Sequence, residues 1–130
     1  MAAVETIVVA YDDPESRTLA RAADLAEALG SALVVTNVAP TDPDDLEEAE
    51  RYGRERLEQA RAYLGQRGLS AEVVQLAGQP AEKIVSLAEA RGADLIVVGM
   101  RRKGFFERLV EGSVAQDVMR RAACDVLAVH

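Results

Sequence analysis

The chain has 130 residues, of which 49% are hydrophobic and 28% charged. This length and composition predict one folded domain over residues 1–130 and exclude a disordered chain. The formal net charge of −7 argues against nucleic acid as a partner, because binding to phosphate backbones requires a basic surface. There is no apolar run of membrane-spanning length and no signal-peptide pattern at the start, so we expect a cytoplasmic protein without a membrane partner.

The first part of the chain alternates strand and helix signals. Residues 6–10, Thr-Ile-Val-Val-Ala, form a continuous β-branched run, typical of a strand buried on both faces. Asp13 is a candidate helix N-cap with Pro14 at the first helical position. The helix ends at Gly30, and residues 32–38 are predicted as the second strand. The apolar positions of the helix are Leu19, Ala22, Ala23, Ala26 and Leu29.

A long helix is predicted over residues 43–66. Acidic residues gather in its first turns and arginines in its last, an order that complements the helix dipole. We interpret these charges as a solvated face. The apolar seam of the helix is Leu46, Ala49, Gly53, Leu57, Ala60 and Leu64.

The second half continues the alternation. Gly68 ends the long helix, and residues 71–76 are the third predicted strand. Pro80 begins a helix that carries Ile84, Val85 and Ala88 and ends at Gly92; residues 94–98 follow as the fourth strand. After a loop over residues 99–111, Ser113 caps a last helix with Val114, Val118 and Met119, and residues 125–129 form the fifth strand. Strict alternation of strands and helices predicts a parallel sheet covered on both faces.

Two loops fall at the carboxyl ends of strands, where ligands bind in such sheets. One is residues 11–13. The other, residues 99–111, exceeds the usual length of about 2–6 residues for such connections. Gly99 would allow close backbone approach to a phosphate, and the helix start at Gly112–Ser113 offers free N–H groups.

The segment 99–113 has four basic and two acidic residues, a net charge of +2 that favours a small anionic ligand. The alternative is a turn glycine followed by a Ser113–Gln116 capping box in a solvated loop. The segment is not a P-loop, because Phe105 and Phe106 follow Gly104 where that motif has lysine and a hydroxyl residue.

Four segments in order resemble the universal stress protein family over essentially the whole chain. They are Ile-Val-Val-Ala-Tyr-Asp at residues 7–12, Asp-Leu-Ile-Val-Val-Gly at 94–99, Gly-Ser-Val-Ala at 112–115, and Ala-Cys-Asp-Val-Leu-Ala-Val at 123–129. The resemblance implies a flavodoxin-like, Rossmann-like three-layer α/β sandwich with a five-stranded parallel sheet in the order 3-2-1-4-5.

The resemblance also implies a nucleotide site. ATP-binding members of the family carry Gly-x2-Gly-x9-Gly-Ser/Thr after the fourth strand; Gly99 and Gly112–Ser113 match it, whereas Arg102 replaces the second glycine. Arg102 either obstructs the phosphates or contacts them. Asp12 would contact the adenine or ribose, and Val38 would line the adenine pocket. The expected ligand is ATP or AMP, with or without Mg²⁺. The candidate nucleotide-binding residues are Ala10, Tyr11, Asp12, Val38, Gly99, Met100, Arg102, Gly112, Ser113 and Val114.

Other activities have weaker support. A phosphorelay receiver would need an aspartate after the third strand and a lysine after the fifth, but Ala77 and His130 stand there. With His130 as the sole histidine, at the end of the chain, a Ser/His/Asp arrangement is excluded, and with one cysteine so are a disulfide and a zinc site built from these residues. Cys124 is predicted to be an inert core thiol. The resemblance implies a regulatory or stress-response protein, which we expect to be non-enzymatic, with slow ATPase activity left open and a nucleotide-free dimeric scaffold as the alternative.

The fifth strand also predicts an assembly. Its residues 126–129 are apolar, without lysine or proline, and in the implied order they lie at the sheet edge. Exposed edges of this kind are usually protected. We expect a homodimer in which residues 126–129 of two copies pair, as the family resemblance also implies.

Overall fold

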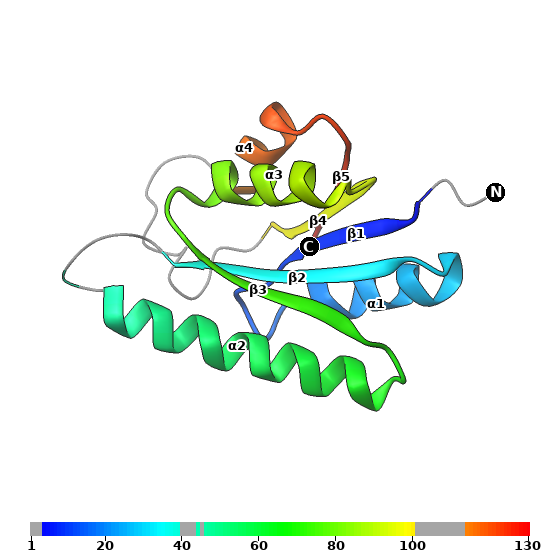
Figure 1. The fold of residues 1–130 in the computed structure, drawn as a ribbon, viewed down its shortest axis with the longest axis horizontal. Helices are drawn as coiled ribbons and strands as arrows, with labels where there is room; N and C mark the ends of the chain where they lie inside the picture. Colours follow the sequence, from blue (N-terminus) through cyan, green and yellow to red (C-terminus); the bar gives the residue numbers. More distant parts are fainter. Residues whose placement is uncertain (1–3, 40–43, 45, 101–113) are drawn as a thin grey trace.

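The computed structural model describes residues 4–39, 44, 46–100 and 114–130. Five strands and four helices alternate along this part of the chain (Figure 1). In order, they are β1 (Thr6–Ala10), α1 (Thr18–Leu29), β2 (Ala32–Ala39), α2 (Leu46–Gln66), β3 (Ala71–Ala77), α3 (Pro80–Arg91), β4 (Leu95–Gly99), α4 (Val114–Arg121) and β5 (Asp125–Val129).

The strands form one parallel sheet in the order β3-β2-β1-β4-β5, which confirms the prediction. β1 lies at the centre, where Val8 is in register with Val34 of β2 and with Ile96 of β4. Because each connection crosses over a helix, all carboxyl ends meet at one edge of the sheet. The described ends of β1 and β4, at Ala10 and Gly99, are therefore neighbours in space.

Side chains of successive strand residues point to opposite faces of the sheet. Ile7 and Val9 of β1 belong to the apolar cluster that includes α1 and α2, whereas Val8 belongs to the cluster that includes α3 and α4. Figure 1 shows these two pairs of helices on opposite sides of the sheet. The structure is thus the predicted three-layer sandwich, with an apolar core on each side of the sheet.

Helix boundaries follow local sequence signals in two cases. Gly30 (φ 68°) and Gly92 (φ 62°) adopt the left-handed conformation at the ends of α1 and α3, as predicted. α3 begins at Pro80, and the Gln79 side chain before it accepts a hydrogen bond from the Glu82 N–H at 2.6 Å. The Ser113 cap lies outside the described residues.

The predicted start of α1 was wrong. Asp13 Oδ1 accepts a hydrogen bond from the Glu15 N–H at 2.9 Å, and the Asp13 carbonyl accepts one from the Ser16 N–H at 3.0 Å. These bonds form a turn, an alternative that Asp offers the backbone in competition with helix. The helix therefore begins at Thr18, which is 1% exposed.

Two apolar residues assigned to helix seams face solvent instead. Leu29 is 44% exposed because α1 ends there, and Met119 of α4 is 45% exposed. The seam of α2 is confirmed at five of its six predicted positions, since Ala49, Gly53, Leu57, Ala60 and Leu64 are buried, whereas Leu46 is half-buried. No helix in the described ranges is both long and apolar enough to cross a membrane.

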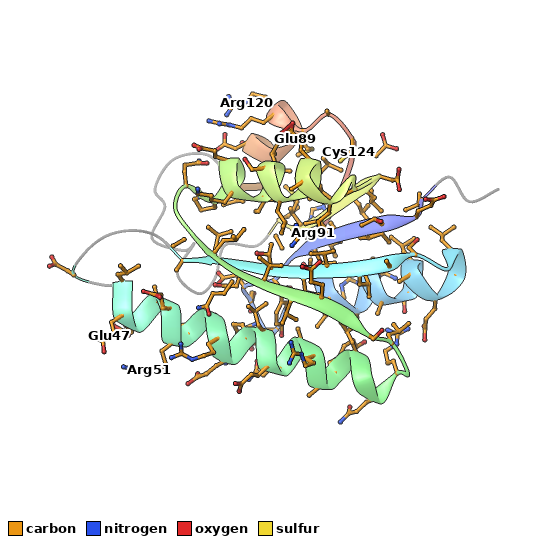
Figure 2. The ribbon with its side chains drawn as sticks, viewed as in Figure 1. Glu47, Arg51, Glu89, Arg91, Arg120 and Cys124 are labelled. Carbon is orange, nitrogen blue, oxygen red and sulfur yellow. The ribbon has the colours of Figure 1, made fainter. Side chains whose placement is uncertain are left out.

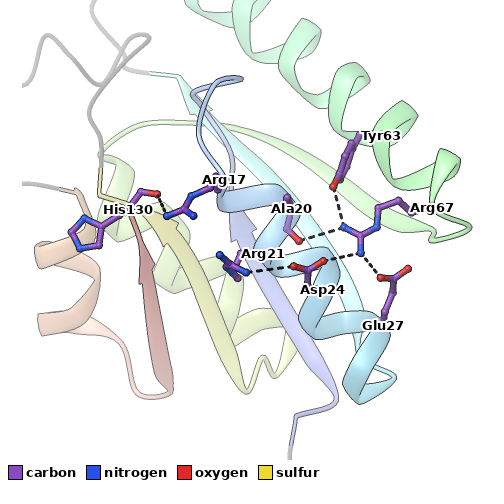
Figure 3. A network of polar contacts seen from close by, with 8 residues as sticks. All are labelled: Arg17, Ala20, Arg21, Asp24, Glu27, Tyr63, Arg67 and His130. Carbon is purple, nitrogen blue, oxygen red and sulfur yellow. Dashed lines mark hydrogen bonds and ion pairs between the residues drawn. The ribbon is translucent and has the colours of Figure 1, made fainter.

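Arg67, just after α2, links this helix to α1 through hydrogen bonds and ion pairs (Figure 3). Its guanidinium donates to Asp24 Oδ1 at 2.8 Å, to Glu27, to the Tyr63 hydroxyl at 3.0 Å and to the Ala20 carbonyl at 3.4 Å. The hydrogen bonds that Arg67 donates to Asp24, Tyr63 and Glu27 raise its pKa further above the ordinary value. α1 and α2 are thus joined at the end of α2 that is remote from the strand carboxyl ends.

Candidate functional site

The carboxyl end of β1 carries a buried polar segment. Asp12 and Asp13 are 8% and 5% exposed, and Tyr11 before them is 6% exposed. Since β1 lies between β2 and β4, this segment is flanked by Val38 and Ala39 at the end of β2 and by Gly99 at the end of β4. The structure therefore brings the described candidate residues to one edge of the sheet, at the position typical of ligand sites in this architecture.

Four candidate residues share one apolar surface. Val38 is a buried member of the cluster beneath α3 and α4. Ala10, Met100 and Val114 are half-buried and pack against that same cluster. Tyr11 differs, because its ring belongs to the cluster on the opposite face. The apolar wall formed by Ala10, Val38, Met100 and Val114 suits a planar base, with Asp12 as an adjacent polar group.

Gly99 has a structural reason for being glycine. A Cβ atom at this position would lie 2.8 Å from Thr18 Oγ1, so α1 approaches the end of β4 too closely for a side chain. The Met100 N–H donates to the Val129 carbonyl at 2.8 Å, which continues the pairing of β4 with β5. Gly99, where the phosphate loop was predicted to begin, is half-buried.

Two side chains that were not among the predicted site residues hold Asp12. Asn37 of β2 is 4% exposed, and its Nδ2 donates to the Tyr11 carbonyl at 2.9 Å and to Asp12 Oδ1 at 3.4 Å. The Tyr52 hydroxyl, from α2, donates to the Asp12 carbonyl at 2.7 Å. A buried amide interrupting the apolar run of β2 was a usable sequence signal for Asn37. Nothing in the sequence linked Tyr52 to Asp12, 40 residues away.

The surroundings keep Tyr52 and Tyr11 protonated. Burial raises the pKa of Tyr52, the Asp12 charge raises it further, and Arg56 opposes the rise. Burial likewise raises the pKa of Tyr11, opposed by Arg56. The Arg56 guanidinium lies 4.6 Å from the centre of the Tyr52 ring, a cation–π distance. Tyr52 therefore remains a hydrogen-bond donor to Asp12 across the physiological pH range.

Three candidate residues, Arg102, Gly112 and Ser113, lie outside the described residues, as do Phe105 and Phe106. In the described part of the chain, no three His, Cys, Asp or Glu side chains are grouped so that they could hold a metal ion. His130 is exposed, and its carbonyl accepts a hydrogen bond from Arg17 at 3.4 Å.

Cys124 lies at the opposite end of the sheet, beside the α3–α4 layer (Figure 2). It is half-buried against the apolar cluster and lines a cavity of about 350 Å³ with Val85, Ala88 and Ile96. Burial raises the pKa of its thiol, which lowers the population of the nucleophilic thiolate. This agrees with the predicted inert role.

The fold and the grouped residues define a flavodoxin-like α/β protein with a polar and apolar site at the strand carboxyl ends. Residues 3–130 match the sequence model of the Universal stress protein family, and the chain belongs to that family. A universal stress protein of Thermus aquaticus, named for its position in the QAH/OAS sulfhydrylase 3′ region, is 39% identical, with 97% of this chain and 98% of that protein aligned. Universal stress protein Rv1636 of Mycobacterium tuberculosis is 32% identical, with 100% of this chain and 99% of that protein aligned.

Solved structures give the same assignment. A universal stress protein from Archaeoglobus fulgidus superposes with a TM-score of 0.81 at 29% identity, covering 97% of this chain and 98% of that one. A universal stress protein crystallised in complex with cAMP has a TM-score of 0.79 at 30% identity, covering 98% of each chain. An Archaeoglobus fulgidus universal stress protein in complex with dAMP has a TM-score of 0.78 at 26% identity, covering 100% of each chain.

Proposed function

We propose that the chain binds an adenine nucleotide, ATP or AMP, at the carboxyl ends of β1, β2 and β4 and acts in a regulatory or stress-response role. The observation that carries this proposal is the buried Asp12 carboxyl at the end of β1, flanked by the ends of β2 and β4 and by the apolar wall. Two structurally similar family members were crystallised with cAMP and dAMP, which supports an adenine nucleotide as the ligand class.

The proposed contacts divide by chemistry. Asp12 would accept hydrogen bonds from the nucleoside, and the wall of Ala10, Val38, Met100 and Val114 would pack against the base. Tyr11 would contribute backbone only, because its ring faces the other core. For the phosphates, the proposal assigns the Gly99 backbone and the sequence positions Arg102, Gly112 and Ser113.

Calorimetric titration with ATP and AMP, with and without Mg²⁺, tests this function. Ligand at about 100 times its dissociation constant stabilises a folded protein by about 2.7 kcal/mol, which raises Tm by several degrees for a domain of this size. Absorbance at 260 nm of protein purified without added nucleotide is an independent check. No heat of binding and no Tm shift with millimolar ATP and AMP would favour the nucleotide-free scaffold.

Substitutions of Arg102 test whether its side chain contacts the phosphates or obstructs them. If its side chain contacts phosphate, Arg102→Ala weakens ATP more than AMP, by about 1.5–3 kcal/mol for a charge-assisted hydrogen bond. If it obstructs the phosphates, Arg102→Gly strengthens binding. Equal affinity in all three proteins would contradict both roles.

We propose that the protein acts in the cytoplasm by binding the nucleotide and does not hydrolyse ATP efficiently. Incubation of the purified protein with ATP and Mg²⁺, followed by measurement of ADP and phosphate, tests for slow hydrolysis. Phosphate release that is lost in Asp12→Asn would overturn the non-enzymatic assignment, whereas release at the buffer rate supports it.

We also propose a homodimer through β5. The described sheet has β5 at its edge, with Asp125 exposed and Val126, Leu127 and Ala128 only half-buried. Leu127→Pro removes a backbone donor and should favour monomer. Sedimentation at micromolar concentration should give twice the 14.0 kDa mass of one chain for the unmodified protein. A mass of one chain would refute the dimer.

A further inference from the structure

We propose that Tyr52 and Asn37 are positioning residues of the nucleotide site, which orient Asp12 toward the nucleoside, and that Gly53 is the residue that allows them to do so. This inference rests on the proposed function and deepens it. It assigns a role in recognition to α2, a helix that contributes none of the residues predicted for the site.

The first observation is the density of hydrogen bonds on residues 11 and 12. Asn37 spans both residues with its two bonds, to the Tyr11 carbonyl (2.9 Å) and to Asp12 Oδ1 (3.4 Å). Tyr52 adds the bond to the Asp12 carbonyl at 2.7 Å. Both the main chain and the carboxyl of Asp12 are thus held by side chains from two different elements, β2 and α2.

The second observation is the close approach of α2 to the sheet next to Tyr52. A Cβ atom on Gly53 would lie 2.5 Å from Asn37 Oδ1 and 3.2 Å from Gln75 Nε2. Gln75 of β3 donates to the Glu50 carbonyl of α2 at 2.6 Å, which holds the helix at this distance. Glycine is required here for packing, and the same packing places the Tyr52 hydroxyl over the end of β1.

Orientation of a carboxylate has a direct effect on affinity. A side chain that is already held in its binding geometry loses less conformational entropy when the ligand arrives. Loss of the Tyr52 bond would leave the Asp12 main chain less restrained without removing any group that touches the nucleotide. The effect should therefore appear in affinity and should depend on the presence of the Asp12 carboxylate.

The test is a set of AMP titrations by calorimetry on the full chain. Tyr52→Phe should raise the AMP dissociation constant by about three- to tenfold, the range of one hydrogen bond. Tyr63→Phe is the matched control, because it removes a hydroxyl of the same helix that contacts Arg67 instead. The control should bind AMP as the unmodified protein does.

A double-mutant cycle distinguishes positioning from general loosening. In an Asp12→Asn background, Tyr52→Phe should cause less than a twofold further change, because the carboxylate that it orients is gone. Equal weakening in both backgrounds would overturn the positioning role. Unchanged AMP affinity in Tyr52→Phe would overturn it as well, while AMP binding by the unmodified protein would leave the proposed function intact. Absence of AMP and ATP binding by the unmodified protein would overturn both.

A second pair of variants tests the helix placement. Gly53→Ala should weaken AMP by more than tenfold, since the added methyl must displace Asn37 or the helix. Gly65→Ala, at a position of the same helix with no atom within 4 Å of the added carbon, should leave AMP affinity unchanged. Thermal unfolding without nucleotide shows whether each variant is folded. A folded Gly53→Ala protein that retains the unmodified affinity would contradict the role given to Gly53.

Discussion

Helix α2 and the residue that follows it carry the same pair of side chains twice, with different consequences. Tyr52 and Arg56 are four residues apart, as are Tyr63 and Arg67, and the second pair follows the first by 11 residues, about three helical turns. Both arginines lie over their tyrosine rings, at 4.6 Å and 5.8 Å from the ring centres. The two pairs therefore lie on the same face of the helix.

Their hydrogen bonds differ in direction. The Tyr52 hydroxyl donates to Asp12 at the candidate site, whereas the Tyr63 hydroxyl accepts from Arg67. Arg67 bonds to two carboxylates of α1, while Arg56, with a side chain only 13% exposed, has a buried Nε that makes no hydrogen bond within the described residues. One pair orients a strand end where a ligand is proposed, and the other joins two helices. The environment supplied by the sheet, not the residue types, decides which role each pair takes.

The largest expected change in stability is at Gly53, where α2 lies close to the sheet beside the Tyr52–Arg56 pair. Gly53→Ala should lower the free energy of unfolding by about 1–3 kcal/mol, as overpacking typically does, because its Cβ would lie 2.5 Å from Asn37 Oδ1. Gly65→Ala, beside the second pair, should be neutral or stabilise by up to about 1 kcal/mol. Urea unfolding of both variants measures the difference. Equal free energies of unfolding for the two variants would show that α2 does not pack tightly against Asn37 at Gly53 in solution.

Arg56 should stabilise mainly through packing on the Tyr52 ring. Arg56→Ala should lower the free energy of unfolding by about 0.5–2 kcal/mol, the range of a cation–π contact between exposed and desolvated sites. Because the side chain is largely buried, we expect the same loss at 0.05 M and 1 M NaCl. A loss that vanishes at high salt would indicate instead a screened surface charge.

The contribution of Tyr52 to stability should decrease at alkaline pH. Burial and the Asp12 charge raise the pKa of Tyr52 above 10, so its neutral form contributes stability that is fully present below pH 10 and is lost as the pH rises through the folded-state pKa. At pH 7, Tyr52→Phe should be less stable by about 0.5–1.5 kcal/mol, one hydrogen bond. The difference from the unmodified protein should shrink above pH 10. Guanidinium unfolding at pH 7 and 10.5 checks this, and a constant difference would contradict it.

The smallest change in stability is expected at Arg67, just after the end of α2. Arg67→Ala removes the ion pairs to Asp24 and Glu27, which link α2 to α1 but face solvent. The variant should have a slightly lower Tm at low salt, and the difference should diminish in 1 M NaCl because exposed ion pairs are screened. A salt-independent decrease would indicate that the Arg67 bonds to Tyr63 and the Ala20 carbonyl dominate.

The sequence by itself determined the architecture of this protein. Strand signals rich in β-branched residues alternate with helical seams along the chain, and the glycines at 30 and 92 mark helix ends, so a covered parallel sheet was predictable from local patterns. The strand order came from the family resemblance, as did Asp12 and Val38 as site candidates. Val38 lies next to the end of β2, and Asp12 follows the neighbouring strand β1. The two positions meet because the carboxyl ends of parallel strands share one edge of the sheet.

Only the tertiary structure decided what surrounds those candidates. Periodicity shows that Gly53 faces the core, but not that it lies against Asn37, since the contact joins positions 16 residues apart through the docking of a helix on a sheet. It equally gives no sign that Tyr52 reaches Asp12 while Tyr63, on the same face, contacts Arg67. Side-chain partners depend on where rigid elements pack, and packing involves the whole chain at once, whereas propensity and capping act within a few residues.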